Sequence, residues 1–303
     1  CGVNTSGAPN YTGHTPFPYV NGKAVLANQV ALPNTVQWDP VFWNGLRDIC
    51  QTARNNGVIV NICLFDGVNL RGCCETYMYS NSPWNPSNHD KSYYPAGDYG
   101  DCGGCFYRVT NFNNNTGVGY YQRALIDKVI ATTADFDNVM FEIGNELGGS
   151  DAAWNAAVVS YVRARTNKPI EQCGGETASN IQGLSDHWFL CVSGVKQRIP
   201  LMLGHGYPGW VDPDNNEWPA CFGLMSCGSN CTAAYAAVDN GQRQGAWYSF
   251  TGGAACWGGF TEDYWEWPNP HRGFSATLGT YYHNLQNFIS DSGVQFWNMV
   301  PMH

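Results

Sequence analysis

Two segments in the first half of the chain each place a helix directly before a buried strand. In the first segment, Asp39 is positioned to cap a helix that starts at Pro40, and Gly57 marks its end. Residues 58–65 then form a nearly continuous apolar run, which is typical of a parallel strand covered on both faces. A second helix followed by an apolar strand at 139–143 repeats the scheme. This repetition predicts a parallel α/β architecture.

The rest of the chain continues the alternation of strands and helices. A strand is expected at 23–30, and the first strand of a barrel is either an irregular piece near 17–20 or missing from this chain. A last helix is expected from about Ser275 to a stop at Gly293. Residues 1–22 are expected to form an irregular N-terminal segment. The remaining apolar runs predict strands at 169–173, 187–192, 199–203, 246–250 and 294–300.

Long insertions rich in Gly, Asn and Pro separate these elements at 67–118, 205–244 and 251–274. Loops of this length are uncommon unless they are functional or locally stapled. Most of the 13 cysteines lie in or beside them, and no set of four has zinc-ligand spacing, although Cys102 and Cys105 come closest. We therefore expect no metal site, and disulfides that are local in sequence, with Cys102 and Cys105 among them.

Cysteine use and sequons both favour export. Four N-x-S/T sequons begin at Asn4, Asn10, Asn114 and Asn230. No apolar run approaches the roughly 18 residues that a membrane span needs. Cys1 is either a lipid-modified cysteine or a chain boundary. The sequence predicts a secreted or cell-surface glycoprotein and leaves its oligomeric state open.

The composition excludes one class of partner and favours another. Charged residues are only 13% of the chain, and the net charge is -9, so a nucleic-acid binder with a basic stripe is excluded. The polar surface must then come from uncharged groups. With 12 Trp and 17 Tyr beside them, such a surface suits neutral ligands rich in hydroxyl groups.

The strand at 139–143 ends in Gly-Asn-Glu, which places Asn145 and Glu146 at its carboxyl end. Parallel barrels assemble their active sites at this end of the strands. Cleavage of a glycosidic bond needs a proton donor at the leaving oxygen and a second carboxylate at the anomeric carbon. Glu146 is therefore expected to be catalytic, its alternative being a helix cap or ion-pair partner, whereas Glu142 is expected to be structural.

Gly-Asn-Glu after an apolar strand resembles the acid/base motif of glycoside hydrolase clan A, the (β/α)₈-barrel cellulases, mannanases and their relatives. Residues 38–67 resemble a third-strand unit of cellulase-like barrels in this clan, and residues 278–301 resemble their closing helix and exit strand. The resemblance implies one (β/α)₈ TIM barrel over residues 1–303, with long disulfide-stapled loops at its C-terminal face. It also implies that Glu146 is the general acid/base and that Asn145 binds the sugar hydroxyl beside the scissile bond.

The nucleophile position departs from the clan pattern. In the clan a glutamate ends the seventh strand, but here the strand expected at 199–203 runs into Gly204 and His205 without a carboxylate. We place the second catalytic carboxylate at Glu262, in the aromatic-rich insertion. The alternative candidates for this second carboxylate are Glu176, Asp212, Asp214, Glu217, Asp263 and Glu266.

Four further residues are expected to bind substrate. Asp66 ends its strand and either contacts a substrate hydroxyl or stabilises a turn. His205 is a neutral sugar contact, a proton relay or a packed histidine. Sugar rings stack on indole planes, and Trp247 and Trp257, on either side of the end of the strand at 246–250, are the expected platforms, although loop indoles also fill loop cores.

These observations predict a secreted glycoside hydrolase that cleaves O-glycosidic bonds in a neutral polysaccharide or oligosaccharide, without a cofactor. If it follows the clan, it retains anomeric configuration. The alternative is a catalytically impaired barrel that binds carbohydrate or serves as a structural, surface-assembled glycoprotein. The missing carboxylate at Gly204-His205 favours that alternative, and the intact Gly-Asn-Glu favours the enzyme.

Overall fold

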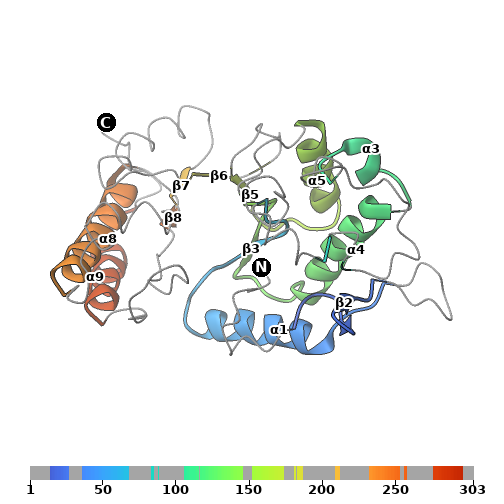
Figure 1. Ribbon diagram of the computed structural model, residues 1–303. Coiled ribbons are helices and arrows are strands. Elements are labelled where there is room, and N and C mark those ends of the chain that lie inside the picture. The colour runs from blue at the N-terminus through green and yellow to red at the C-terminus, as the bar shows by residue number, and fades with distance from the viewer. Residues whose placement is uncertain are drawn as a thin grey trace. The chain divides into compact units, whose positions relative to one another are not determined.

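The chain divides into two compact units, Cys1–Ile181 and Gln182–His303, whose elements are labelled in Figure 1. The computed structural model describes residues 14–26, 36–67, 83–84, 88, 106–115, 117–145, 152–173, 181, 183–186, 209–211, 232–252, 256–257 and 276–295. The predicted mixed α/β class is confirmed, with parallel strands and helices in both units. No closed barrel is seen among the strands that these residues form.

The first unit opens with a β-hairpin that the sequence analysis did not anticipate. β1 (Tyr19–Val20) pairs antiparallel with β2 (Lys23–Ala24). Asn21 and Gly22 form the two-residue turn with φ of 52° and 75°, as the Asn-Gly pair of a type I′ turn requires. The expectation of an irregular segment over 1–22 was therefore wrong for its last residues, and the strand expected at 23–30 ends at Ala24 within the described range.

Helix α1 (Pro40–Asn55) has the predicted signals at both ends. The Asp39 carboxylate accepts a hydrogen bond of 2.9 Å from the Val41 amide and so satisfies one N–H of the first turn. Gly57 adopts φ of 67° just beyond the helix, a conformation that glycine tolerates best. Asp39 and Gly57 thus fix the length of the helix.

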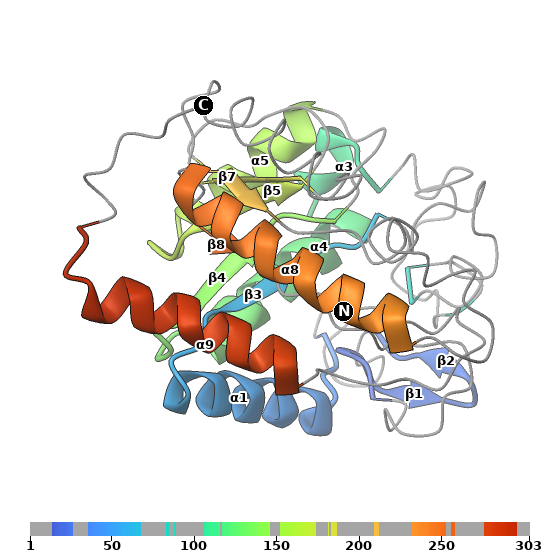
Figure 2. The same ribbon diagram turned by 90° about the vertical axis from the view of Figure 1, so that its left-hand side faces the viewer.

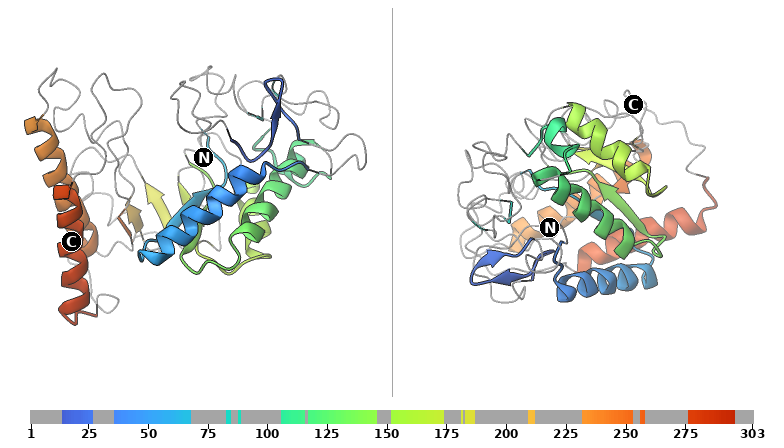
Figure 3. Two further views of the ribbon diagram at one scale, coloured as in Figure 1. Left: turned by 90° about the horizontal axis from the view of Figure 1, so that it is seen from below. Right: turned by 90° about the vertical axis from the view of Figure 1, so that its right-hand side faces the viewer.

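Three parallel strands form the sheet of the first unit, β3 (Val60–Cys63), β4 (Val139–Glu142) and β5 (Ile170–Cys173), in that order. Helices α4 (Gly117–Thr132) and α5 (Ala152–Arg163) lie on one side of this sheet (Figure 3). The strands predicted at 58–65, 139–143 and 169–173 are confirmed. In the register of the sheet, the apolar residues Ile62, Phe141 and Ile170 form one row, at most 5% exposed.

A short helix, α3 (Val109–Phe112), packs closely against the start of α4. The approach requires Gly119, because a Cβ at that position would overlap the Asn111 carbonyl oxygen and lie 2.7 Å from the Phe112 Cα. α3 falls inside the insertion at 67–118, so that insertion has helical structure at its end. The Phe112 ring also packs edge-on against Trp154 of α5, with centroids 6.3 Å apart.

The second unit contains three short parallel strands, β6 (Gly183–Asp186), β7 (Gly209–Val211) and β8 (Cys256–Trp257). Helices α8 (Thr232–Gly252) and α9 (Ala276–Asp291) lie side by side (Figure 2). The last predicted helix is thereby confirmed, whereas none of the three strands begins where the sequence analysis expected one.

The strand expected at 246–250 was wrong, because these residues belong to α8. Alanine-rich residues that favour a helix precede them, and the helix continues through the aromatic run at its end. The strands expected at 187–192 and 199–203 lie outside the described residues. The expected strand at 294–300 lies outside them too, apart from its first two residues, which are not a strand.

The described cysteine side chains form no disulfide. Cys50 is a buried residue with a free thiol on α1, and Cys63 on β3 also has a free thiol and is partly exposed as a whole residue. Cys102, Cys105 and the other cysteine side chains of the insertions lie outside the described residues, so the disulfide staples expected there stay a prediction.

Candidate functional site

The carboxyl ends of β3 and β4 bring two predicted site residues together. Asp66 and Asn145 form a parallel bridge beyond the two strands. The Asn145 amide donates to the Phe65 carbonyl at 3.0 Å, and the Gly67 amide donates to the Asn145 carbonyl at 2.8 Å. Both Asp66 and Asn145 are partly exposed, so this edge presents a carboxylate and a carboxamide on neighbouring backbones.

Asn145 reaches this position because the strand before it is anchored from both sides. The four residues of β4 are all buried, and Ile143 after them is 0% exposed. The Ile143 amide donates to the Glu171 carbonyl at 3.0 Å, which holds the chain to β5 just before the turn at Gly144. The pairing therefore fixes the backbone up to Asn145, and Glu146 is the next residue in sequence but lies outside the described residues.

A polar row crosses the same sheet below this edge. Cys63, Glu142 and Glu171 are register partners on β3, β4 and β5, so their side chains share one face. Glu142 is 9% exposed and Glu171 is 3% exposed. The Asn61 side chain, two residues before Cys63 and on the same face, donates a hydrogen bond to the Glu171 carboxylate. Alternation along the strands places this row opposite the apolar row of the sheet.

The surroundings of the Cys63 thiol favour its protonated form. Burial, and then the negative charge of Glu142, raise the pKa of the thiol well above its ordinary value of 9.0. Because the thiolate is the reactive form, a thiol with a raised pKa is a poor nucleophile at neutral pH.

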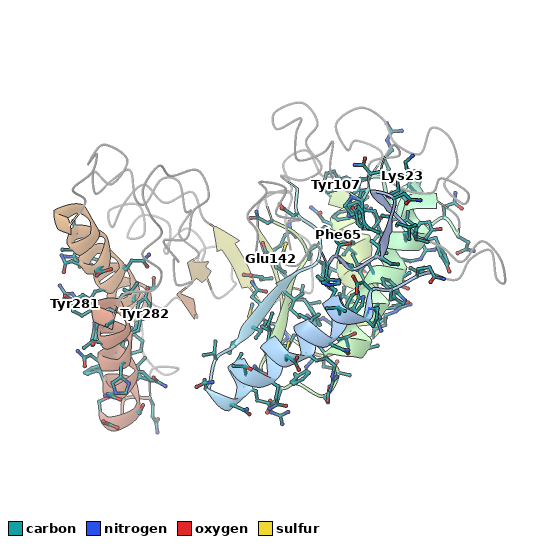
Figure 4. All side chains as sticks on the ribbon, turned by 60° about the horizontal axis from the view of Figure 1, so that its bottom comes forward. Lys23, Phe65, Tyr107, Glu142, Tyr281 and Tyr282 are labelled. Carbon is teal, nitrogen blue, oxygen red and sulfur yellow. The ribbon has the colours of Figure 1, made fainter. Side chains whose placement is uncertain are left out.

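An aromatic cluster fills the core next to the site edge. The Phe65 ring, directly before Asp66, packs edge-on against Phe106 with centroids 5.4 Å apart and tilts against Trp154 at 5.6 Å. Trp84, from the first insertion, is 8% exposed and packs against Phe106 at 5.1 Å. This indole fills a core. In Figure 4, Glu142 lies beside the strands while Phe65 and Tyr107 lie toward the helices.

Trp247 does not lie at a strand end. It is on α8, where its ring packs against Phe288 of α9 with centroids 5.2 Å apart and against Phe250 at 6.4 Å. Trp257 lies in β8, whose backbone pairs it with Val211 of β7, and its side chain is outside the described residues. The structure therefore does not bring Trp247 to the edge of a sheet as the strand prediction required.

The remaining predicted site residues, Glu146, His205 and Glu262, lie outside the described residues. Two polar residues of the sheet were missed by the sequence analysis, Asn61 and Glu171. Each interrupts an apolar strand with a polar side chain, and the register between strands, which the sequence of one strand does not contain, is needed to place them on one face.

No metal centre is formed by the described residues, in which no three His, Cys, Asp or Glu side chains are arranged to hold an ion. None of the described helices is long and apolar enough to cross a membrane. Comparisons with protein-family models, curated proteins and solved structures find no match to this chain.

Proposed function

We propose that this chain is a secreted glycoside hydrolase acting on a neutral polysaccharide or oligosaccharide, with Glu146 as its general acid/base. The observation that carries the proposal is the bridge between Asp66 and Asn145 at the carboxyl ends of β3 and β4. Glu146 follows Asn145 directly in sequence, and parallel α/β enzymes collect their functional groups at the edge where Asn145 lies. Clusters of aromatic residues and a low content of charge support a neutral, hydroxyl-rich substrate.

The proposal includes the fold that such a site needs, a single (β/α)₈ barrel formed by the strands of both units. Two features support it. The first unit alternates parallel strands with helices along the chain, and the second unit contains parallel strands and two helices. In the first unit, the face with the apolar row Ile62, Phe141 and Ile170 is opposite a buried polar face with Glu142 and Glu171, and a barrel interior encloses one face of every strand.

In this mechanism Glu146 gives its proton to the glycosidic oxygen as the bond from that oxygen to the anomeric carbon breaks. The second carboxylate, which we assign to Glu262, forms a bond to the anomeric carbon from the opposite side. Water then gives a proton to Glu146 while its oxygen forms a bond to the anomeric carbon and the bond from that carbon to the Glu262 carboxylate breaks. This second inversion leaves the anomeric configuration retained. Such a pair of carboxyl groups stands about 5–5.5 Å apart.

The other proposed residues bind rather than react. The Asn145 carboxamide binds the hydroxyl beside the scissile bond, and the adjacent Asp66 carboxylate accepts a hydrogen bond from another hydroxyl. His205 contacts the sugar as a neutral imidazole. Trp257 stacks on a sugar ring. Trp247 is a weaker platform than the sequence suggested, because its ring already packs against Phe288.

The experiment is hydrolysis of a panel of neutral oligosaccharides by Glu146→Gln and Glu262→Ala variants. We expect Glu146→Gln to lower turnover by about 10²–10⁴-fold, the usual contribution of a general acid/base. Asp48→Asn, which removes an exposed carboxylate on α1, is the matched control and should leave turnover unchanged. Azide should restore activity to Glu262→Ala alone, because the small anion attacks in place of the missing carboxylate. Full activity of Glu146→Gln would contradict the assignment.

One observation favours a second function, that of a carbohydrate-binding or structural glycoprotein. The segment expected to supply the nucleophile runs into Gly204 and His205 and has no carboxylate. If the unmutated protein binds oligosaccharides and cleaves none of the panel, this second function replaces the first.

A further inference from the structure

The sequon Asn114-Asn115-Thr116 begins in the turn that follows helix α3. Of the four sequons in the chain, this is the one whose acceptor asparagine lies among the described residues. Asn114 is exposed, as are Asn113 and Asn115 on either side of it. An N-linked glycan needs such a position, because the acceptor side chain must enter the active site of the transferase and then hold a bulky, hydrated oligosaccharide.

Hydrogen bonds to backbone groups hold this turn in place. The Arg123 guanidinium, on α4, donates to the Asn114 carbonyl at 2.7 Å and also to the Phe112 carbonyl. The Asn114 amide donates to the Asn111 carbonyl at 3.0 Å. Arg123 also contacts the Asn115 side-chain oxygen at 3.3 Å. The turn is thus held against α4 through its carbonyl groups, and residue 114 is exposed.

From this geometry we infer that Asn114 is an acceptor for an N-linked oligosaccharide. In the transfer, the bond between the anomeric carbon and the diphosphate of a lipid-linked oligosaccharide donor breaks. The Asn114 amide nitrogen loses a proton and forms the new bond to that carbon, and the lipid diphosphate leaves. The inference rests on the exported state within the proposed function and does not depend on hydrolysis.

The test is to express the full chain behind a cleavable secretion leader in a eukaryotic cell line and to map the glycans on all of the protein, secreted and cell-associated. Trypsin cleaves after Arg108 and Arg123, so the peptide 109–123 contains this sequon and no other. Enzymatic removal of the glycan in heavy-oxygen water converts only a glycosylated asparagine into labelled aspartate. We expect the label at residue 114 in most copies of this peptide.

Four variants distinguish an effect on the glycosylation sequon from an effect on the structure of the turn. Asn114→Gln and Thr116→Ala should each remove one glycan from the intact mass, whereas Thr116→Ser should keep it. Asn113→Gln changes an exposed asparagine of the same turn outside the sequon, and it should also keep the glycan. Because Asn114→Gln keeps the carbonyl that Arg123 binds, it should leave the circular dichroism spectrum unchanged.

An unlabelled residue 114 overturns the inference, whether the other sequons carry glycans or the whole chain carries none. Its failure is distinguishable from failure of the proposed hydrolase, because turnover is measured on the same preparations. A glycosylated chain without turnover contradicts the enzyme alone, and an active chain with residue 114 unmodified contradicts the glycan alone.

Discussion

Asp39 connects the start of helix α1 to the segment before it. Its carboxylate accepts from the Val41 amide at 2.9 Å and contacts His14 Nδ1 at 2.6 Å. Burial by itself raises the pKa of this carboxyl, but the hydrogen bonds from His14 and the Val41 amide outweigh it, and the pKa lies below its ordinary value of 3.8. The ionised carboxylate therefore stabilises the folded chain at neutral pH.

The charge of Asp39 predicts how Asp39→Ala and Asp39→Asn differ in their free energy of unfolding. Asp39→Ala removes the cap and should lower the free energy of unfolding by about 1 kcal/mol at pH 7. Asp39→Asn keeps a capping side chain but loses the charge, so it should cost less. Because the folded pKa is lowered, the contribution of the charge is present above the unfolded pKa and is lost as the pH falls through the folded pKa.

Urea unfolding of the three proteins between pH 7 and pH 2 measures the effect. The difference between the wild type and Asp39→Asn should shrink toward the acid end of this range. A difference that stays constant over the whole range would contradict the assigned role of the Asp39 charge.

The two described thiols give a prediction about cysteine pairing. Burial raises the pKa of both Cys50 and Cys63, so both should react slowly with an alkylating reagent in the native protein. In denaturant without reductant, both should react fully, whereas cysteines in the insertions should react only after reduction. Two of the 13 cysteines are free, so eleven remain, and in a single chain at least one more must be unpaired.

Mass spectrometry of the labelled peptides distinguishes free cysteines from cysteines in disulfides. Labelling of nearly all cysteines without reductant would contradict both the disulfide staples and the exported state. Labelling of Cys50 and Cys63 with protection of Cys102 and Cys105 is the expected pattern.

At the scale of elements, the contact between α3 and α4 depends on one missing side chain. Gly119→Ala would place a Cβ 2.6 Å from the Asn111 carbonyl carbon, which is backbone and can move away only with the whole of α3. Overpacking of this kind costs about 1–3 kcal/mol, which exceeds the gain in helix propensity of up to about 1 kcal/mol. Gly119→Ala should therefore destabilise the protein.

Gly45 supplies the matched control. It lies within α1, and a Cβ there would meet nothing within 4 Å. Gly45→Ala should therefore stabilise the protein by about 0.5–1 kcal/mol through propensity alone. Thermal unfolding of both variants tests the pair, and equal shifts in the same direction would contradict the close packing of α3 on α4.

Local signals predicted some elements well and others poorly for identifiable reasons. The caps at Asp39 and Gly57 act within one turn of the chain, so the limits of α1 could be predicted from sequence. The aromatic run at 246–250 has the composition of a strand, yet it is the end of α8, because an aromatic side chain packs equally well from a helix onto Phe288. The hairpin turn at Asn21-Gly22 had a recognisable signal that was overlooked.

At the scale of the molecule, the neighbourhood of Asp66 and Asn145 was predictable because parallel strands place their carboxyl ends at one edge. The polar row formed by Cys63, Glu142 and Glu171 could not be predicted from the sequence. Glu142 and Glu171 are neighbours because of the register between β4 and β5, which the sequence of neither strand contains. Burying two carboxyl groups is costly unless polar partners surround them, and the Asn61 side chain is one such partner of Glu171. The proposed single barrel would enclose the polar face that contains these two carboxyl groups.

That proposal makes a prediction about cooperativity. If all the strands belong to one barrel, the two units should unfold together, because neither could keep its sheet once the barrel opens. Hydrogen exchange of the full-length, disulfide-intact protein across a urea series follows peptides of α4 and α9 separately. The two sets of peptides should lose protection at the same urea concentration, with one cooperative transition. Midpoints that differ clearly between α4 and α9 would show two independently stable domains, and the single barrel would then be wrong.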